Sequence, residues 1–209
     1  QGNWHEITFE KISFYLIKNK KHLDYACGPG TLIGRYSNSD SIGVDISENQ
    51  IKYAREKYED KKFLEIKDFN FNEHKEYFDI ITIIGLFEFL NDDEIIELLN
   101  KLLMNLKSGG KILITTPNFS FFFKFIIFLQ NIFSDVNYKK LHVNKVTSKK
   151  LKKLLTRNNF TSFNISKILN FGVFFSIISN KFGKKLNQTI RKISRSNLGY
   201  LIFIELEKK

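Results

Sequence analysis

Cysteine and proline are scarce in this chain of 209 residues, which contains one cysteine and two prolines. The single cysteine, Cys27, can form neither an internal disulfide nor a cysteine-based zinc cluster. We therefore expect no metal site and a reducing, cytoplasmic environment. No apolar run reaches the roughly 18–20 residues that a transmembrane helix needs. The length fits a single domain that spans residues 1–209.

Acidic residues are fewer than basic ones. Lysine and arginine number 33 against 22 aspartates and glutamates, which gives a formal net charge of +11. A nucleic acid, an anionic lipid surface or a phosphorylated substrate would each suit this charge. The basic residues are nearly all lysine, however, and Lys, Asn, Ile and Phe are all abundant, as in a compositionally biased genome. The charge alone therefore identifies no partner.

Short apolar runs alternate with amphipathic stretches, a pattern typical of βαβ units and a mostly parallel sheet. We predict strands over residues 22–27, 41–46, 62–66, 78–84, 111–116, 161–169 and 199–206. We predict helices over residues 4–18, 47–58, 91–106 and 147–158, and another that begins near Thr31. Gly109 and Gly110 are expected to end the 91–106 helix in a left-handed turn.

The first predicted strand runs into a glycine turn, with Asp24 before the turn and Gly28 and Gly30 within it. Glycines in such a turn let a ligand touch the backbone, because no Cβ intervenes. About 20 residues later the second strand ends in Asp45, where a carboxylate can bind both hydroxyls of a ribose. The spacing of Gly28, Gly30 and Gly34 does not match the G-x-G-x-x-G motif of dinucleotide sites. A carboxylate at Asp24 would also repel phosphate and attract an ammonium or sulfonium group.

These residues resemble the motifs of class I S-adenosylmethionine-dependent methyltransferases, an EC 2.1.1 type of enzyme. The first motif of that family is Asp-x-Gly-Cys-Gly-x-Gly, and residues 24–30 read Asp-Tyr-Ala-Cys-Gly-Pro-Gly. Similar segments follow in the family's order at residues 43–47, 67–69, 78–81, 85–90 and 106–118. The resemblance implies a doubly wound, Rossmann-like α/β sandwich. Its mainly parallel seven-stranded sheet would have an antiparallel last strand and a helical insert that caps the substrate.

The resemblance also implies S-adenosylmethionine as cofactor and S-adenosylhomocysteine as product. It implies that Asp24, Ala26 and Gly28 hold the methionine end, and that Gly30 permits close approach of the cofactor. Asp45 would bind the ribose hydroxyls. Ala26 replaces the glycine that is usual at its position, a change that is tolerated where the φ of the alanine is negative.

Five more residues are matched to the adenine and the sulfonium. The resemblance implies that Ile46 packs on the adenine. It implies that Asp68 accepts a hydrogen bond from the adenine amino group, with Phe69 beside it. Ile84 and Gly85 would line the sulfonium. Residues 22–118 thus form the expected cofactor-binding core.

A hydroxyl acceptor also needs a general base, and histidine is the side chain whose pKa best suits this role at neutral pH. The family often has Glu-His where this chain has Glu88-Phe89, so the base considered at that place is absent. Related small-molecule O-methyltransferases often carry a histidine after the fifth strand. His142 is therefore the candidate catalytic residue, as base or substrate ligand, against a structural role. His22 and His74 are expected to be bystanders.

Three segments outside the core are expected to determine the acceptor: an N-terminal lid helix within residues 1–20, and substrate-cap segments at 119–146 and 170–198. The two cap segments contain phenylalanine-rich runs, and the second continues into a basic stretch. Such runs suit an interfacial helix at the inner face of a membrane, or a pocket for a lipid-linked or phosphorylated acceptor. They equally suit packing on the sheet. Asp79 is expected to order the loop near the fourth strand.

We therefore predict methyl transfer to a small molecule, at a hydroxyl oxygen of a sugar, a phosphorylated metabolite or a quinone-like compound. An RNA methyltransferase is the first alternative. Against it, the only prolines are Pro29 and Pro117, which excludes the Asn/Asp-Pro-Pro-Tyr motif of many nucleic-acid amino-methyltransferases. A non-catalytic module that binds the cofactor is the second alternative. The sequence leaves the oligomeric state open.

Overall fold

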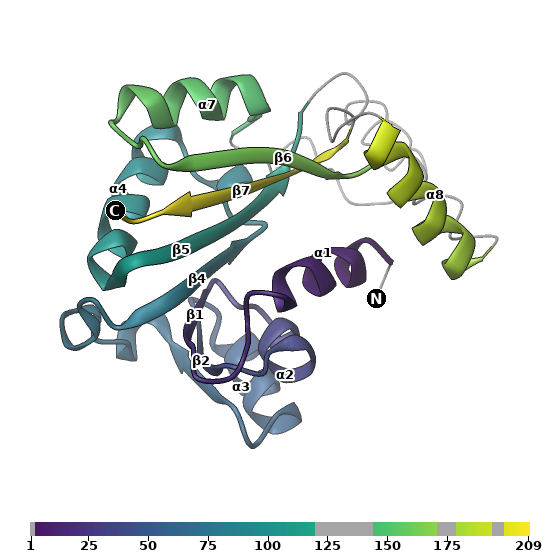
Figure 1. Ribbon diagram of the computed structural model, residues 1–209. Helices are drawn as coiled ribbons and strands as arrows, with labels where there is room; N and C mark the ends of the chain where they lie inside the picture. The colour runs from purple at the N-terminus through teal and green to yellow at the C-terminus, as the bar shows by residue number, and fades with distance from the viewer. Residues whose placement is uncertain (1–2, 120–143, 171–178, 194–198) are drawn as a thin grey trace. The chain divides into compact units, whose positions relative to one another are not determined.

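The computed structural model describes residues 3–119, 144–170, 179–193 and 199–209 (Figure 1). These residues form two compact units, which are described separately. The first unit contains residues 3–5, residues 85–97 and the described part of 115–204. The second unit contains residues 6–84, 98–114 and 205–209.

The second unit contains the parallel part of the sheet. Its strands are β1 (Lys21–Tyr25), β2 (Asp40–Asp45), β3 (Lys62–Glu65) and β4 (Phe78–Ile84). Strands β2 and β4 both pair with β1 in parallel, and β3 pairs with the other side of β2. Opposite Tyr25, the register places Val44 of β2 and Ile83 of β4. The three strands therefore end at one edge, where the sequence has its glycine turn and its carboxylates.

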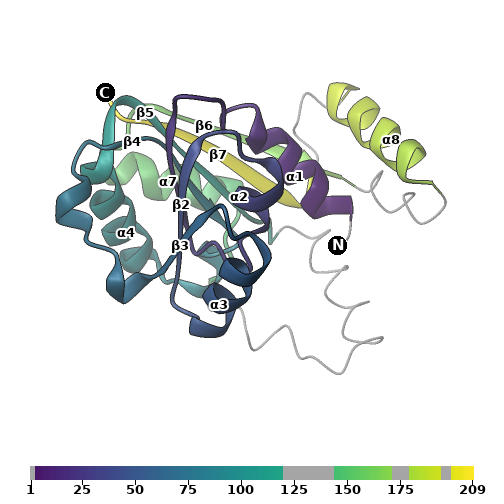
Figure 2. The ribbon, with the colours of Figure 1, turned by 90° about the horizontal axis from the view of Figure 1, so that it is seen from below.

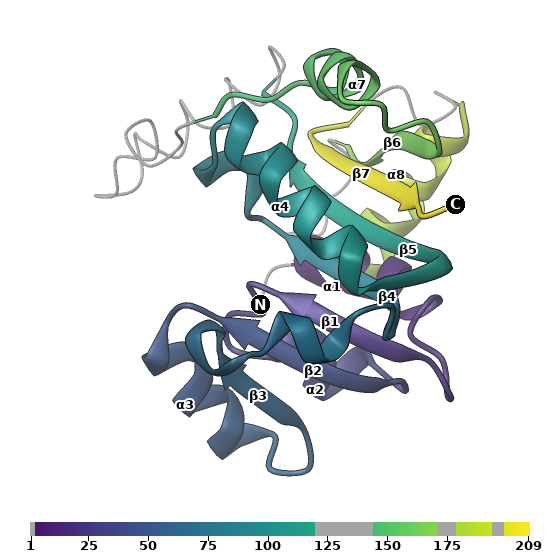
Figure 3. The ribbon, with the colours of Figure 1, turned by 90° about the vertical axis from the view of Figure 1, so that its left-hand side faces the viewer.

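Two helices cover this part of the sheet. Helix α2 (Thr31–Tyr36) follows β1, helix α3 (Glu48–Lys57) follows β2, and both contact β2 (Figure 3). Ser47 is the N-cap of α3, since its hydroxyl accepts a hydrogen bond from the Gln50 amide. Ile51 and Ala54 bury the inner face of α3 in a cluster with Phe63 of β3. The predicted 47–58 helix is confirmed to within a residue at each end.

The remaining helices before β5 are α1 (Asn3–Ser13), α4 (Asp92–Asn105) and short 3-10 turns at Ile66–Asp68, Phe71–His74 and Phe87–Phe89. Helix α1 is shorter than the predicted 4–18 helix. The Tyr15 amide donates to the Ile12 carbonyl, and the Leu16 amide to the Ser13 carbonyl. These bonds to the residue three before tighten the chain and end the α-helix.

The seven strands within the described ranges form one mixed sheet in the order β3-β2-β1-β4-β5-β7-β6. The added strands are β5 (Leu106–Pro117), β6 (Phe163–Leu169) and β7 (Leu201–Glu207). The Gly109 amide donates to the Lys208 carbonyl, and the Asn118 amide donates to the Tyr200 carbonyl. Strand β7 therefore runs antiparallel to β5. The predicted seven-stranded, mainly parallel sheet with an antiparallel last strand is confirmed.

Gly109 and Gly110 belong to β5, and not to a turn that ends the preceding helix. Helix α4 ends at Asn105, and β5 begins at the next residue. Gly109 keeps the expected left-handed backbone, with a φ of 73°. The amide of Lys208, however, donates to the Gly110 carbonyl. Pairing with the distant β7 thus extends the strand through residues that local signals assign to a turn.

The first unit contains helix α7 (Ser148–Arg157) and helix α8 (Asn180–Ile193), which lies in the predicted insert 170–198. Figures 1 and 2 both show α8 beyond the end of β6. Two hydrogen bonds of 3.0 Å fasten it there, from the Asn170 amide to Asn187 Oδ1 and from Asn170 Nδ2 to the Asn187 carbonyl. Among the helices in the described ranges, none has the length and apolarity to cross a membrane.

Candidate active site

The turn that follows β1 passes through three residues with left-handed backbones: the φ angles of Ala26, Gly28 and Gly30 are 61°, 51° and 71°. A Cβ added at Gly28 would meet no atom of the described residues within 4 Å, so these residues leave the space in front of Gly28 open. A Cβ at Gly30 would lie 2.5 Å from the Phe63 ring. The turn therefore offers bare backbone to a ligand at Gly28, whereas Gly30 is a glycine because the turn packs against β3.

Ala26 departs from the expectation of a negative φ. Its φ of 61° places a residue with a Cβ in a region that favours glycine. For an L-residue this conformation costs roughly 1–2 kcal/mol. The next residue is held by β2, since the Cys27 amide donates to the Val44 carbonyl at 3.0 Å. Backbone strain of this kind is concentrated at ligand sites and switches.

Asp45, the last residue of β2, is 9% exposed and holds the turn after β1. Its Oδ2 accepts a hydrogen bond from the Gly28 amide at 2.8 Å, and its Oδ1 accepts one from the Ser47 amide at 2.9 Å. A carboxylate oxygen has two lone pairs, so each oxygen retains one acceptor site. Two neighbouring hydroxyls would fit this pair of acceptor sites.

Asp24 lies in β1 and is 2% exposed. The Thr82 hydroxyl, on the neighbouring β4, donates to Asp24 Oδ1 at 2.6 Å. Burial raises the pKa of Asp24 to about 7, while the Thr82 hydrogen bond opposes this shift and the charge of Asp45 adds to it. Among the residues that the structure describes, none supplies a cation to this carboxyl. A cationic group of a ligand would therefore find an acceptor here.

Thr82 also joins Asp24 to a buried histidine. His22 is fully buried, with Nε2 2.9 Å from the Thr82 hydroxyl and Nδ1 2.9 Å from the Ser41 hydroxyl of β2. Burial lowers the pKa of His22 to about 3, so the ring is neutral at physiological pH. The sequence predicts no functional role for His22, because the residue pattern of a single strand does not show which side chains form hydrogen bonds across three strands. In the structure, His22 lies in the middle of a series of hydrogen-bonded polar side chains.

The three residues matched to the adenine differ in exposure. Ile46 directly follows β2 and is 86% exposed, which is unusual for a large apolar side chain beside a buried carboxylate. Asp68 is also exposed. Phe69 is 4% exposed, and its ring lies 4.8 Å from the Phe71 ring and 4.6 Å from the His74 ring. The Phe69 ring thus belongs to an aromatic cluster, whereas Ile46 leaves apolar surface uncovered.

Ile84 ends β4 in the second unit, and Gly85 begins the next segment, in the first unit. Gly85 has a φ of 66°, and its amide donates to the Thr115 carbonyl at 2.9 Å. A Cβ at Gly85 would lie 3.5 Å from Oε1 of Glu88, so the Glu88 carboxyl faces this glycine. Glu88 is 6% exposed, and its Oε2 accepts a hydrogen bond from the Thr116 hydroxyl at 3.1 Å.

Glu88 was not a candidate on sequence grounds. The sequence draws attention to Phe89, where related proteins often have histidine, yet the residue before it carries the buried carboxyl. Burial raises the pKa of Glu88, and the hydrogen bond from Thr116 only partly offsets this. The sequence does contain a signal for Glu88: a glutamate within an apolar segment that follows a buried strand is unusual, since glutamate is rarely buried. The candidate base His142 lies outside the described residues.

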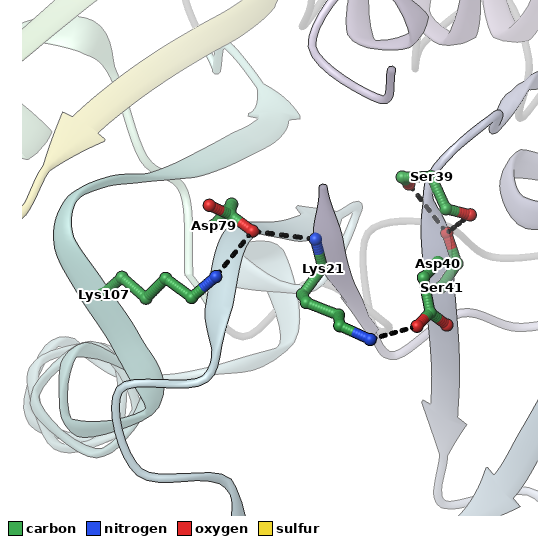
Figure 4. Close-up of polar contacts among 6 residues, drawn as sticks. All are labelled: Lys21, Ser39, Asp40, Ser41, Asp79 and Lys107. Atoms are coloured by element: carbon green, nitrogen blue, oxygen red, sulfur yellow. Dashed lines mark hydrogen bonds and ion pairs between the residues drawn. The ribbon is translucent and has the colours of Figure 1, made fainter. Parts of the chain in front are cut away.

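Asp79 lies at the other end of β4 and orders the start of the strand (Figure 4). Its Oδ2 accepts hydrogen bonds from the Lys21 amide at 2.8 Å and from Lys107 Nζ at 3.0 Å. Lys20 Nζ lies 3.4 Å from Oδ1. These contacts connect β4 with β1 and β5. They are the ordering contacts expected of Asp79, far along the strand from the turn at Gly28.

The chain matches the family described as a methyltransferase domain over residues 5–164. Comparison with curated proteins finds no match. Among solved structures, it is similar to a SAM dependent methyltransferase from Archaeoglobus fulgidus, with 20% identity, a TM-score of 0.65 and coverage of 100% of this chain and 95% of that one.

Two further structures have named activities. One is the plantazolicin methyltransferase BpumL in complex with a triazolic desmethylPZN analog and SAH, with 21% identity, a TM-score of 0.67 and coverage of 99% of this chain and 86% of that one. The other is phosphoethanolamine N-methyltransferase 2 of Haemonchus contortus in complex with S-adenosyl-L-methionine, with 15% identity, a TM-score of 0.60 and coverage of 99% and 53%. At these identities the similarity shows a shared fold.

Proposed function

The chain belongs to the methyltransferase domain family that its residues 5–164 match, and we propose that it transfers a methyl group from S-adenosylmethionine to a hydroxyl oxygen of a small molecule. The acceptor classes that we propose are a sugar, a phosphorylated metabolite and a quinone-like compound. One observation supports the cofactor in this proposal: two buried carboxylates, Asp24 and Asp45, lie at or near the ends of neighbouring strands, close to the open backbone at Gly28.

The described residues of the second unit fit this cofactor. Asp24 offers an acceptor to the methionyl ammonium, and Gly28 offers backbone without a Cβ beside it. Asp45 retains one acceptor site on each oxygen for the two ribose hydroxyls. Ile46 offers exposed apolar surface to the adenine, and Asp68 an exposed acceptor to its amino group.

Five further residues shape this site in the proposal. Ala26 and Gly30 hold the turn in its left-handed course. Phe69 anchors the segment that presents the adenine acceptor, because its ring is buried in the aromatic cluster. Ile84 and the residue after it line the sulfonium.

Bound S-adenosylmethionine supplies a methyl group that its sulfonium has already activated. The protein then has to align the acceptor and exclude water. We propose Glu88 as the group that takes the proton of the acceptor hydroxyl, since its carboxyl faces Gly85, which the family resemblance places at the sulfonium. Burial raises the pKa of Glu88, which makes its ionised form a stronger base near neutral pH. His142 is the second candidate for this role.

We also propose that the acceptor is anionic or lipid-linked, and that the protein makes peripheral contact with the cytoplasmic face of a membrane. Helix α8 supports this. Phe182 and Ile193 lie about three turns apart on one side of it and are 50% and 79% exposed. Lys181, Lys185 and Lys192 are exposed next to them. Apolar side chains flanked by cations suit anionic lipid headgroups.

The test uses S-adenosylmethionine labelled on its methyl group, incubated with the protein and a lysate of its source organism. Label in the organic phase supports a quinone-like or lipid-linked acceptor, and label in aqueous small molecules supports a sugar or phosphorylated acceptor. Label that nuclease releases would replace the small-molecule proposal with an RNA methyltransferase. Cofactor binding with no transfer to any fraction would leave a non-catalytic module. Asp45→Ala serves as the control for enzyme-dependent transfer.

A further inference from the structure

A continuous line of buried hydrogen-bonding side chains crosses three neighbouring strands and ends at Asp24. It runs from the Ser41 hydroxyl on β2 to the His22 ring on β1, and from that ring to the Thr82 hydroxyl on β4, with distances of 2.9 Å for both contacts. The last contact, from Thr82 to Asp24, is 2.6 Å. The register brings the four together, because Ser41 pairs with His22 and Thr82 pairs with Asp24. None of the four is more than 8% exposed.

The chemistry of Asp24 determines the direction of these hydrogen bonds. An ionised carboxyl can only accept, so the Thr82 hydroxyl donates its one proton to Asp24. Thr82 must then accept from His22, which requires the proton of the neutral ring to be on Nε2. Nδ1 is left with a lone pair, and the Ser41 hydroxyl donates to it. Every donor in this arrangement has an acceptor.

The same groups can form the opposite arrangement when Asp24 is protonated. The carboxyl then donates to Thr82, Thr82 donates to Nε2 of His22, and Nδ1–H donates to Ser41. The Ser41 hydroxyl has a further acceptor in the Ser39 carbonyl at 3.3 Å.

The change between the two arrangements balances in protons. One proton enters from solvent at Ser41, and one proton passes along each link to Asp24. Ser37 and Ser39 are partly exposed and lie 2.8 Å and 3.0 Å from the Ser41 hydroxyl, so they connect the line with solvent (Figure 4 shows Ser39 and Ser41).

We propose that Ser41, His22 and Thr82 form a positioning chain that orients the Asp24 carboxyl for the methionyl ammonium of the cofactor and reverses its hydrogen bonds when Asp24 takes up a proton. This inference rests on the proposed function, because the cofactor is the group that uses Asp24. The three residues act through Asp24 and not by touching the cofactor. Both protonation states keep the carboxyl bonded, so it is already in place when a cation arrives.

The charges around Asp24 identify it as the group that titrates. Burial raises the pKa of Asp24 to about 7, and the Asp45 carboxylate at the end of β2 adds to this. Burial lowers the pKa of His22 to about 3, so this histidine gains no proton near neutral pH. A further titratable neighbour among the described residues is the Cys27 thiol in the turn, whose pKa burial raises, so that it too stays neutral.

The first test measures binding of S-adenosylhomocysteine by titration calorimetry as a function of pH. Wild-type affinity should fall below about pH 7, as Asp24 becomes neutral. Thr82→Val keeps the shape but removes the donor that stabilises the carboxylate. We expect binding about tenfold weaker at neutral pH, and a pH midpoint that moves upward. Thr82→Ser should restore the wild-type profile.

The matched control is Thr115→Val, which removes an equally buried hydroxyl from β5 in the other compact unit and should leave the pH midpoint unchanged. If Thr82→Val does not fold, Ser41→Ala replaces it. Ser41→Ala removes both the donor to Nδ1 and the acceptor of Nδ1–H. Because a buried N–H without an acceptor is the costlier of the two, the ring should keep its proton on Nε2 and the pH midpoint should move downward.

The second test needs no cofactor. Nitrogen-15 NMR of the His22 ring should show the proton on Nε2 above about pH 7 and on Nδ1 below it, while the ring stays neutral. One unchanging tautomer across this range would overturn the reversal. A Thr82→Val profile identical to wild type would overturn the positioning role and leave the proposed function standing. No binding by the wild type at any pH would instead overturn the proposed function, and this inference with it.

Discussion

The Gly28 amide donates a hydrogen bond of 2.8 Å to Oδ2 of Asp45, so the last residue of β2 holds the turn that follows β1. The other oxygen of the same carboxylate accepts from the Ser47 amide, at the start of α3. One side chain thus connects two strand ends that are both proposed to contact the cofactor. A change at Asp45 should therefore affect more than a contact with ribose.

Asp45→Ala should weaken binding of S-adenosylhomocysteine by about 1.5–3 kcal/mol, the scale of hydrogen bonds lost to a charged group. Titration calorimetry measures this. Asp45→Asn keeps one oxygen as acceptor and should lose less. Asp60→Ala is the control, because that side chain is 77% exposed and pairs only with its neighbour Lys61 among the described residues. Unchanged affinity of Asp45→Ala would contradict the ribose assignment.

Ala26→Gly should raise the free energy of unfolding by about 0.5–1 kcal/mol, because glycine removes the strain of a left-handed backbone at that residue. Urea unfolding gives the difference. Ala54→Gly, at a fully buried position of α3, should lower the free energy of unfolding by about 1 kcal/mol or more. Equal losses at both positions would show that the φ of Ala26 carries no strain.

Asp24 and His22, two buried titratable groups of the second unit, should give the stability opposite dependences on pH. The pKa of Asp24 rises from 3.8 in the unfolded chain to about 7 in the fold, so between these values the folded state holds the extra proton and stability falls as pH rises. The pKa of His22 falls from 6.5 to about 3, so there the unfolded state holds the extra proton and stability rises with pH.

Asp24→Asn should remove the contribution to stability that falls as pH rises, and it should leave the contribution of His22, which rises with pH. Relative to wild type, its free energy of unfolding should increase with pH between about 4 and 6.5, by up to about 1.4 kcal/mol per pH unit. His22→Gln should show the opposite trend relative to wild type. Urea unfolding over this range measures both, and parallel profiles for all three proteins would refute the two shifts.

Glu88→Gln should lower kcat by about 10²–10⁴, because an amide cannot take the acceptor proton, while cofactor affinity changes little. The substitution keeps an oxygen for the Thr116 hydrogen bond. Glu97→Gln, at an exposed position of α4, is the matched control. Full activity of Glu88→Gln together with loss of activity in His142→Gln would assign the base to His142.

The double variant Lys181→Glu and Lys185→Glu should reduce binding to vesicles that contain anionic lipid. Each removed positive charge is worth about 1 kcal/mol near such a surface. Cosedimentation at two salt concentrations measures the effect, which should weaken as salt increases. Lys152→Glu with Lys153→Glu, at exposed positions of α7, gives the same charge change elsewhere. Equal binding of wild type to neutral vesicles would contradict an electrostatic contact through α8.

Much of the fold could be predicted from local sequence patterns. The strand predicted over 78–84 is observed as Phe78–Ile84, because a nearly continuous apolar run is typical of a strand that is buried on both faces of a parallel sheet. Gly109 shows where this fails. Its assignment to β5 depends on a hydrogen bond to Lys208, far along the chain, which no local pattern contains.

In the candidate site, too, some features could be predicted from local sequence patterns and others could not. Asp24 and Asp45 are found from the sequence because each lies at a fixed distance from a glycine turn or a strand end. The part played by His22 needs the register of three strands, which sets its contacts with Ser41 and Thr82. The positive φ of Ala26 likewise needs the turn itself, since alanine alone favours a negative value.

The place of β7 has a consequence for synthesis on the ribosome. This strand lies between β5 and β6 but comes after both in the sequence. Until residues 201–207 have been translated, β6 has no neighbour in the sheet and one edge of β5 is open. Open strand edges are templates for pairing with other nascent chains. The sheet therefore cannot close during translation of its first six strands, and chaperones would matter most in the interval between β5 and β7.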